Sequence, residues 1–134
     1  MPSQRIILKN GGVLVDRIGD SPLRYVNDVA VARNGKLYFT EASTKFGAAE
    51  HGGTLEASLL DILEHGGHGL LVEYDPGTEN TRVLLDGLNF ANGVAVSEDQ
   101  QYLLVAETGS YRILRYWLAG PRRGASDVLL DNLP

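Results

Sequence analysis

Three histidines beside glycines are the first residues whose types and spacing suggest chemistry. His51 opens the stretch HGG, and His65 and His68 belong to the stretch HGGHG. Zinc normally takes three or four His, Cys or acid ligands, and these are the only three histidines of a chain without cysteine. A histidine–glycine–glycine loop can also build an oxyanion hole, but the G-x-S-x-G nucleophile elbow that accompanies it is absent. We therefore expect turn and helix-end roles for these histidines.

Glu41 and Glu107 are the next candidates, because each carboxyl group closes a short apolar stretch. The two stretches are residues 37–41 (LYFTE) and 103–107 (LLVAE). An acid in this position typically faces water or accepts hydrogen bonds from a neighbouring loop. We expect one of these two roles for both acids, and the sequence leaves the catalytic residues unknown.

The balance of charge argues against a protein that binds nucleic acid. The 134 residues hold 12 Lys and Arg against 17 Asp and Glu, a formal charge of −5, whereas nucleic acid usually requires a basic face. Arg112, Arg115, Arg122 and Arg123 form a mild basic cluster, which we interpret as a solvated surface. The absence of cysteine excludes disulfides and thiolate chemistry.

No part of the sequence predicts a membrane segment. Residues 1–10 lack an apolar stretch long enough for the core of a signal peptide, and no segment approaches the roughly 18 apolar residues of a membrane span. The chain as written is expected to be soluble. A signal or anchor carried by a longer protein would not be visible here, so the compartment stays open.

The elements that must position these residues occur twice along the chain. Residues 26–31 (VNDVAV) match residues 91–96 (ANGVAV), and each copy continues through three further apolar stretches. These stretches pair as 37–41 with 103–107, 70–74 with 112–116, and 83–86 with 128–131. They are short, rich in Val, Leu and Tyr, and separated by turn residues, which is typical of β-strands.

The turns between these stretches follow from glycine, asparagine and proline. Residues 34–35 (NG) predict a type I′ hairpin turn, in which both central residues have positive φ. Residues 75–77 (DPG) predict a turn in which the glycine takes the positive φ. Residues 92–93 (NG) would give a second hairpin turn in isolation, but the repeat places them at the start of a strand, with the turn at residues 98–99.

The repeat predicts an all-β fold with two four-stranded antiparallel blades of a β-propeller. The expected boundaries are an outer strand of a preceding blade at 11–18, a first blade at 26–87 and a second blade at 91–131. The first blade carries an insertion at 42–67, whose second part has the apolar spacing of a short amphipathic helix. We expect this helix to pack over one end of the blades, and a role as a lid is the alternative.

Two blades do not close a propeller, which typically has four to eight. The chain is therefore expected either to be part of a longer polypeptide or to assemble with copies of itself. Three copies of two blades would complete six, as a homotrimer. Otherwise the remaining blades belong to sequence outside these 134 residues.

In combination, six stretches of the chain resemble the strictosidine-synthase-like family of six-bladed β-propellers. The resemblance covers most of the chain from residue 26 to residue 134. The stretches are 37–46 (LYFTEASTKF), 58–64 (SLLDILE), 69–76 (GLLVEYDP), 83–94 (VLLDGLNFANGV), 103–108 (LLVAET) and 112–117 (RILRYW). The family is more distantly similar to calcium-dependent paraoxonases, gluconolactonases and phosphotriesterase propellers.

The resemblance implies a metal site at Asn27 and Asn92. In the calcium-dependent relatives, asparagines at the starts of the innermost strands hold a calcium ion in the central channel, and these two residues occupy such starts. Calcium takes six to eight oxygen ligands, including asparagine carbonyls. The resemblance implies that the remaining ligands come from other blades and that Asp28 orients the site. The alternative is that both asparagines bond loop backbone through their side chains.

Three functions remain open for the protein to which these blades belong. The first is metal-dependent hydrolysis of lactones or esters, in which calcium polarises the carbonyl of a small-molecule substrate. The second is a non-catalytic propeller that binds a ligand or a partner. The third is the amine–aldehyde condensation of strictosidine synthase, whose essential glutamate has no counterpart in this sequence.

Overall fold

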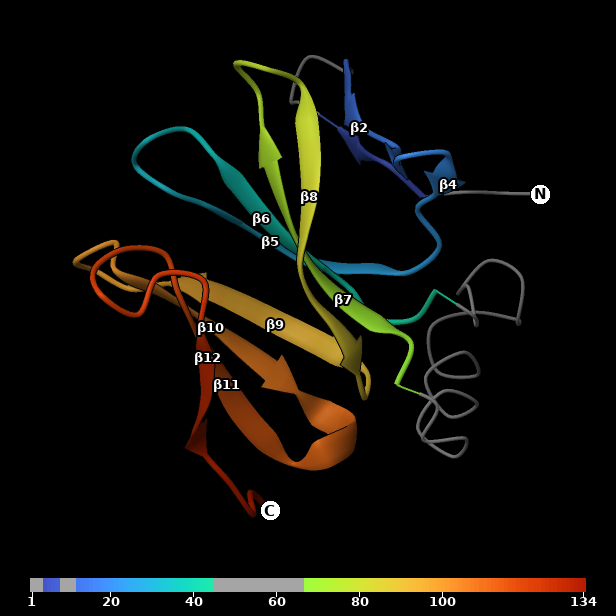
Figure 1. Ribbon diagram of the computed structural model, residues 1–134. Coiled ribbons are helices and arrows are strands. Elements are labelled where there is room, and N and C mark those ends of the chain that lie inside the picture. Colours follow the sequence, from blue (N-terminus) through green and yellow to red (C-terminus); the bar gives the residue numbers. More distant parts are fainter. Residues whose placement is uncertain (1–3, 8–11, 45–66) are drawn as a thin grey trace.

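A computed structural model describes residues 4–7, 12–44 and 67–134, shown in colour in Figure 1. These residues form twelve strands and one short 3-10 turn, Thr108–Ser110. None of the described residues belongs to a helix long and apolar enough to cross a membrane. The helix predicted in the second part of the insertion at 42–67 lies outside the described residues.

Two four-stranded antiparallel sheets make up most of the structure, and we call them blade 1 and blade 2 (Figure 1). Blade 1 consists of β5 (Val26–Val31), β6 (Leu37–Glu41), β7 (Gly69–Asp75) and β8 (Asn80–Leu88). Blade 2 consists of β9 (Ala91–Val96), β10 (Tyr102–Glu107), β11 (Arg112–Trp117) and β12 (Ser126–Leu130). In each sheet the strands lie in the order of the sequence. The predicted all-β fold with two four-stranded antiparallel blades is confirmed.

The two blades are built on one pattern of strand pairing. Leu37 pairs with Tyr74 in blade 1, and Leu103 pairs with Tyr116 in blade 2, so each position of one blade has a counterpart in the other. Asn92 lies inside β9 and not in a turn, as the repeat predicts. This register makes it possible to compare equivalent side chains of the two blades directly.

The hydrophobic core lies largely between the blades. The buried side chains of Tyr38 and Leu71 from blade 1 belong to the same cluster as Leu103 and Val105 from blade 2. Because side chains alternate along a strand, these residues all point to the faces at which the two sheets meet. Just before the innermost strands, Tyr25 and Phe90 meet edge to face, with ring centroids 5.2 Å apart and an interplanar angle of 88°.

The opposite face of blade 1 is covered by the N-terminal part of the chain (Figure 1). Leu23, Phe39 and Val72 are completely buried there. The covering strands are β1 (Ile6–Ile7), β2 (Val13–Val15), β3 (Arg17–Ile18) and β4 (Ser21–Pro22). The sequence at 11–18 was expected to give one outer strand. In the structure β2 pairs with β1, and β3 pairs with β4.

The hairpin between β5 and β6 differs from the predicted type I′ turn. The Gly35 N–H donates to the Ala32 carbonyl at 3.0 Å, and the Ala32 N–H donates to the Lys36 carbonyl at 2.9 Å. Gly35 takes the left-handed conformation at φ 90°, and Asn34 does not share it. The loop is therefore a type I turn followed by one left-handed residue, because it is one residue longer than a type I′ hairpin allows. Blade 2 also has a left-handed residue in this hairpin, Gln100 at φ 61°, but its loop is one residue longer, because the Ser97 N–H donates to the Tyr102 carbonyl at 2.9 Å.

The two ends of the segment that joins β6 to β7 are hydrogen-bonded to each other. The backbone N–H and the hydroxyl of Thr44 each donate to the His68 carbonyl at 3.0 Å. Residues 45–66 lie between these anchors. The anchors stand at the end of blade 1 where β6 stops and β5 starts, since Val26 pairs with Glu41.

Candidate functional site

Asn27 and Asn92 stand at the same position on two neighbouring strands. Each is the second residue of the innermost strand of its blade, β5 and β9, and these two strands pack against each other. We call this end of the two blades the asparagine end. Within the described residues, neither side-chain amide makes a hydrogen bond. Both amides are therefore available to an external ligand.

Asp28 connects the two innermost strands beside these asparagines. Its Oδ2 accepts a hydrogen bond from the Val94 N–H of blade 2 at 3.0 Å, while Oδ1 accepts from the Val29 N–H at 2.9 Å. A side chain at Gly93 would come within 3.8 Å of Oδ2. Both carboxylate oxygens of Asp28 thus accept hydrogen bonds from backbone N–H groups. The bond to Val94 holds β5 against β9 and so fixes the relative placement of the two asparagines.

Thr40 supplies the second polar link between the blades. Its hydroxyl oxygen accepts from the Asp28 N–H at 3.2 Å, and its hydroxyl donates to the Asn92 carbonyl. The Thr40 side chain is completely buried. Buried hydroxyl groups need such partners, because an unpaired one carries a desolvation penalty.

The asparagine end offers ligands of the kind that calcium binds, but fewer of them than a calcium ion needs. Asparagine carbonyl oxygens are ordinary calcium ligands. No group of three or more His, Asp or Glu that could hold a metal occurs among residues 4–7, 12–44 and 67–134. The amide oxygens of Asn27 and Asn92 would therefore hold the ion together with oxygens from elsewhere.

Glu41 and Glu107 are both buried and both bind a loop, so the solvated alternative is ruled out. The Glu41 carboxylate accepts hydrogen bonds from the Arg24 N–H, at 3.1 Å to each oxygen, and from the Tyr25 N–H. The Glu107 carboxylate accepts from the Asn89 N–H at 2.8 Å. Each acid thus fixes the loop that leads into the innermost strand of its own blade, one or two residues before the strand that carries the asparagine.

The two acids differ in what stands opposite them. Arg112 pairs with Glu107 across the sheet, and its Nε lies 2.5 Å from the Glu107 carboxylate. In blade 1 the equivalent position is Leu70. Burial raises the pKa of Glu41 to about 7, although the N–H groups of Tyr25 and Arg24 act in the opposite direction.

The remaining candidates from the sequence have structural surroundings. His68 uses its carbonyl to anchor Thr44, and His51 and His65 lie outside the described residues. In the basic cluster, Arg115 makes two hydrogen bonds to Asp127, at 3.0 and 2.6 Å. Its guanidinium also lies 4.6 Å from the centre of the Trp117 ring.

Sequence reasoning missed the bonds that Asp28 and Thr40 make between the blades. One signal was present in the repeat. Asp28 of the first copy is aligned with Gly93 of the second, so the first copy has a carboxylate side chain at a position where the second copy has no side chain. A space left by a missing side chain, next to an acid on an adjacent strand, is where a carboxylate can reach the neighbouring backbone.

Comparisons with known proteins agree with this architecture. A family model described as strictosidine synthase matches residues 27–121. Protein STRICTOSIDINE SYNTHASE-LIKE 13 of Arabidopsis thaliana is 35% identical over 129 residues, which cover 94% of this chain and 30% of that protein. Adipocyte plasma membrane-associated protein of Rattus norvegicus is 38% identical over 113 residues, which cover 84% of this chain and 28% of that protein.

A solved structure shows the same arrangement of strands. A gluconolactonase from Xanthomonas campestris superposes with a TM-score of 0.64 at 27% identity, covering 90% of this chain and 37% of the other. The chain thus spans about a third of the length of the proteins it matches. By the extent of the family match and the β-propeller architecture of its two blades, the chain belongs to the strictosidine synthase family.

Proposed function

We propose that these two blades belong to a metal-dependent hydrolase of lactones or esters, with Asn27 and Asn92 as two of the calcium ligands. The observation that carries the proposal is the placement of two unbonded amide side chains at equivalent positions on touching innermost strands. The similarity to a gluconolactonase supports the choice of substrate class.

Each residue around the asparagine end has a defined task in this proposal. Asn27 and Asn92 present neutral carbonyl oxygens to the ion. Asp28 and Thr40 hold the two strands so that both carbonyls stay in place. The chemistry that calcium supplies when bound is polarisation of the substrate carbonyl.

The test begins with calcium binding by the chain itself. With two amide ligands we expect weak affinity, about 10⁻³ M or poorer, which NMR detects through chemical-shift changes. Calcium should shift the side-chain NH₂ signals of Asn27 and Asn92 and the backbone signals at the starts of β5 and β9. Asn92→Ala should abolish these shifts. Asn80→Ala, which removes an exposed amide from an outer strand, should leave them unchanged.

Shifts scattered over surface carboxylates and insensitive to Asn92→Ala would contradict the ligand assignment. Hydrolysis is assayed separately, on aryl esters and lactones with and without calcium. Calcium-dependent turnover would support the enzyme. Specific calcium binding with no turnover in the assembled propeller would favour the non-catalytic, ligand-binding alternative.

A further inference from the structure

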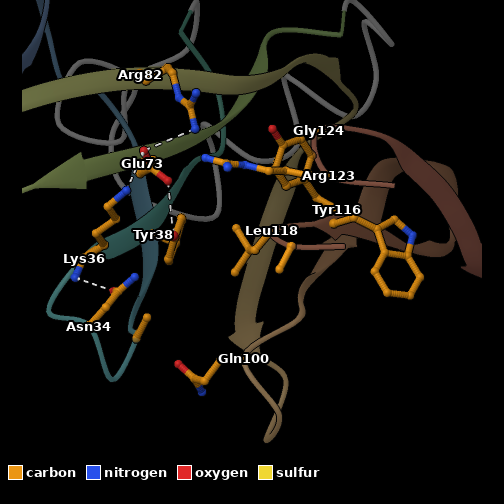
Figure 2. Close-up of a pocket in the computed structure, with 13 residues that line it drawn as sticks. Asn34, Lys36, Tyr38, Glu73, Arg82, Gln100, Tyr116, Leu118, Arg123 and Gly124 are labelled. Atoms are coloured by element: carbon orange, nitrogen blue, oxygen red, sulfur yellow. Dashed lines mark hydrogen bonds and ion pairs between the residues drawn. The ribbon is translucent and has the colours of Figure 1, made fainter. Parts of the chain in front are cut away.

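A polar pocket of about 620 Å³ lies between the blades at the end away from the asparagines (Figure 2). Asn34, from the turn after β5, and Gln100, from the turn after β9, both line it. Asn27 and Asn92 stand at the opposite ends of the same two strands. Both walls of the pocket are present in this chain, so it does not depend on further blades.

The lining of this pocket carries an excess of positive charge in an acidic chain. Lys36, Arg82 and Arg123 contribute three cations, against Glu73 as the one acid among the described lining residues. The whole chain has a formal charge of −5. A local excess of cations inside a partly enclosed space attracts anions more strongly than the same charges would on an open surface.

Glu73 is already fully engaged by blade 1. Its carboxylate lies 3.3 Å from Arg82 Nη2 and 3.9 Å from Lys36 Nζ, and it accepts a hydrogen bond from the Tyr38 hydroxyl at 3.1 Å. Burial, reinforced by the Glu73 carboxylate, raises the pKa of Tyr38 above its ordinary value, so Tyr38 stays a hydrogen-bond donor. Glu73 therefore anchors the floor of the pocket and holds Arg82 at its edge through Nη2 alone, while Arg123 keeps its whole guanidinium for a ligand.

Arg123 reaches the pocket from the other blade. It belongs to the loop between β11 and β12, and its guanidinium makes no ion pair with any described residue. Figure 2 shows Arg123 and Arg82 extending toward the same space from opposite blades. Arg123 does not pair with Glu73. The ion pairs that stabilise blade 1 therefore do not need this cation.

We propose that this pocket binds a small organic anion, whose carboxylate lies between Arg82 and Arg123. The planar guanidinium fork matches a carboxylate in geometry as well as charge. The apolar part of the ligand would lie against Tyr116 and Leu118, which line the blade 2 side. The pocket volume falls within the range of small-molecule sites, about 300–1,000 Å³. The site is independent of the function proposed for the asparagine end.

The experiment uses Trp117, which is the single tryptophan of the chain and lines the pocket. Its fluorescence is followed during titration with hexanoate, hexan-1-ol or inorganic phosphate, without calcium and at constant ionic strength. We expect a saturable change with hexanoate and none with hexan-1-ol, which lacks the charge. The thermal unfolding temperature should rise with hexanoate over the same concentrations.

Arg123→Gln should weaken hexanoate binding about tenfold or more, because the variant loses a charge-assisted hydrogen bond to the carboxylate. The matched control is Arg122→Gln. Arg122 is the adjacent residue and lies over the Trp117 ring, outside the pocket, so its loss should change the starting fluorescence and not the affinity.

Three results would overturn the proposal. They are the absence of a saturable response, an equal loss of affinity in Arg122→Gln and Arg123→Gln, and tighter binding of phosphate than of hexanoate. The last would show a site for inorganic anions and not for organic ones. None of these results affects the calcium site, since the titration contains no calcium and the asparagines are unchanged.

Discussion

Glu41 and Glu107 show how one position of a repeat acquires two different electrostatic settings. Both carboxylates are at most 2% exposed. Glu107 faces the Arg112 guanidinium, whereas Glu41 stands opposite the hydrocarbon side chain of Leu70. Without a cation at that position, burial dominates and raises the pKa of Glu41 to about 7.

This setting predicts a stability that falls as the pH rises. The pKa of Glu41 is higher in the folded chain, about 7, than its ordinary value of 4.5, so the folded state binds the proton more tightly. This tighter binding of the proton stabilises the folded chain fully below about pH 4.5, and the stabilisation is lost as the pH rises toward 7. Its size is roughly 3 kcal/mol, at about 1.4 kcal/mol for each pKa unit.

Urea unfolding of the wild type and Glu41→Gln between about pH 5 and pH 8 measures this contribution. The uncharged amide should remove the part of the slope that belongs to Glu41. Glu107→Gln is the matched control for the loss of a buried carboxylate that binds a loop, and it should lower stability because Arg112 loses its ion-pair partner. Parallel curves for the wild type and Glu41→Gln would show that Glu41 does not titrate in this range.

At the scale of single residues, the place of a residue along its strand could be predicted from the sequence, whereas the burial and the partners of its side chain could not. The repeat placed Asn27 and Asn92 at the starts of equivalent strands, where the structure has them. It also placed Glu41 and Glu107 at strand ends. Their burial depends on how the loops before β5 and β9 fold back over the carboxylates, which is a tertiary contact that no local pattern encodes.

At the scale of elements, the two blades share one cross-strand ion pair with its charges reversed. Glu73 pairs with Arg82 in blade 1, and Arg115 pairs with Asp127 at the equivalent positions of blade 2. The pairing between the third and fourth strands is thus kept, while the sign of each position changes. The blades therefore differ in the sign of these paired charges while the register of the strands is the same.

The contact between the blades yields a prediction for Thr40→Val. Valine keeps the shape of threonine and removes the hydroxyl group, so the Asp28 N–H and the Asn92 carbonyl each lose a hydrogen-bond partner. Because Thr40 is completely buried, we expect the free energy of unfolding to fall by roughly 1–3 kcal/mol in urea titrations.

Thr81→Val provides the comparison for this substitution. Thr81 lies on the outer strand β8 and is half-buried, and its replacement should change stability by less than about 0.5 kcal/mol. Equal losses in both variants would mean that the Thr40 hydroxyl does not join the blades. The calcium-induced shifts at Asn92 should also weaken in Thr40→Val, because its carbonyl is no longer held.

Turns were the elements that the sequence predicted least well. The strands could be located because their apolar pattern occurs twice. The residues that carry positive φ could be located only in part. Gly35 carries it as expected, whereas in the turn after β7 Gly77 was expected to carry it and Glu79 does so, at φ 58°. The Asp75 side chain accepts from the Gly77 N–H at 2.9 Å, and this local bond moves the left-handed residue further along the loop.

At the scale of the whole molecule, the outer strand of blade 2 leaves apolar side chains in water. Val128, Leu129 and Leu130 on β12 are 44%, 39% and 52% exposed, and β12 is an edge of its sheet. An apolar edge strand is a site for pairing with another chain. We therefore expect the chain to associate, and Leu130→Lys to reduce its mass in solution toward 14.5 kDa.

Light scattering coupled to size exclusion measures this mass. Tyr111→Lys is the control, since Tyr111 is 59% exposed but lies between β10 and β11 and on no strand, and it should associate as the wild type does. A wild type that is monomeric at all concentrations would contradict the role of β12. A defined mass of three times 14.5 kDa would mean that three chains supply six blades. In that case every calcium ligand would come from this sequence, contributed once by each of the three chains.

The long connection in blade 1 has a consequence for the order of folding. The strands of blade 2 follow one another through short turns, so each pair can form soon after its neighbour. In blade 1, β6 and β7 can pair only after residues 42–68 have closed into a loop. Closing a longer loop costs more chain entropy, roughly 0.6 kcal/mol for each doubling of length. Blade 2 is thus the part of the chain able to complete first, and it offers the surface on which blade 1 then assembles.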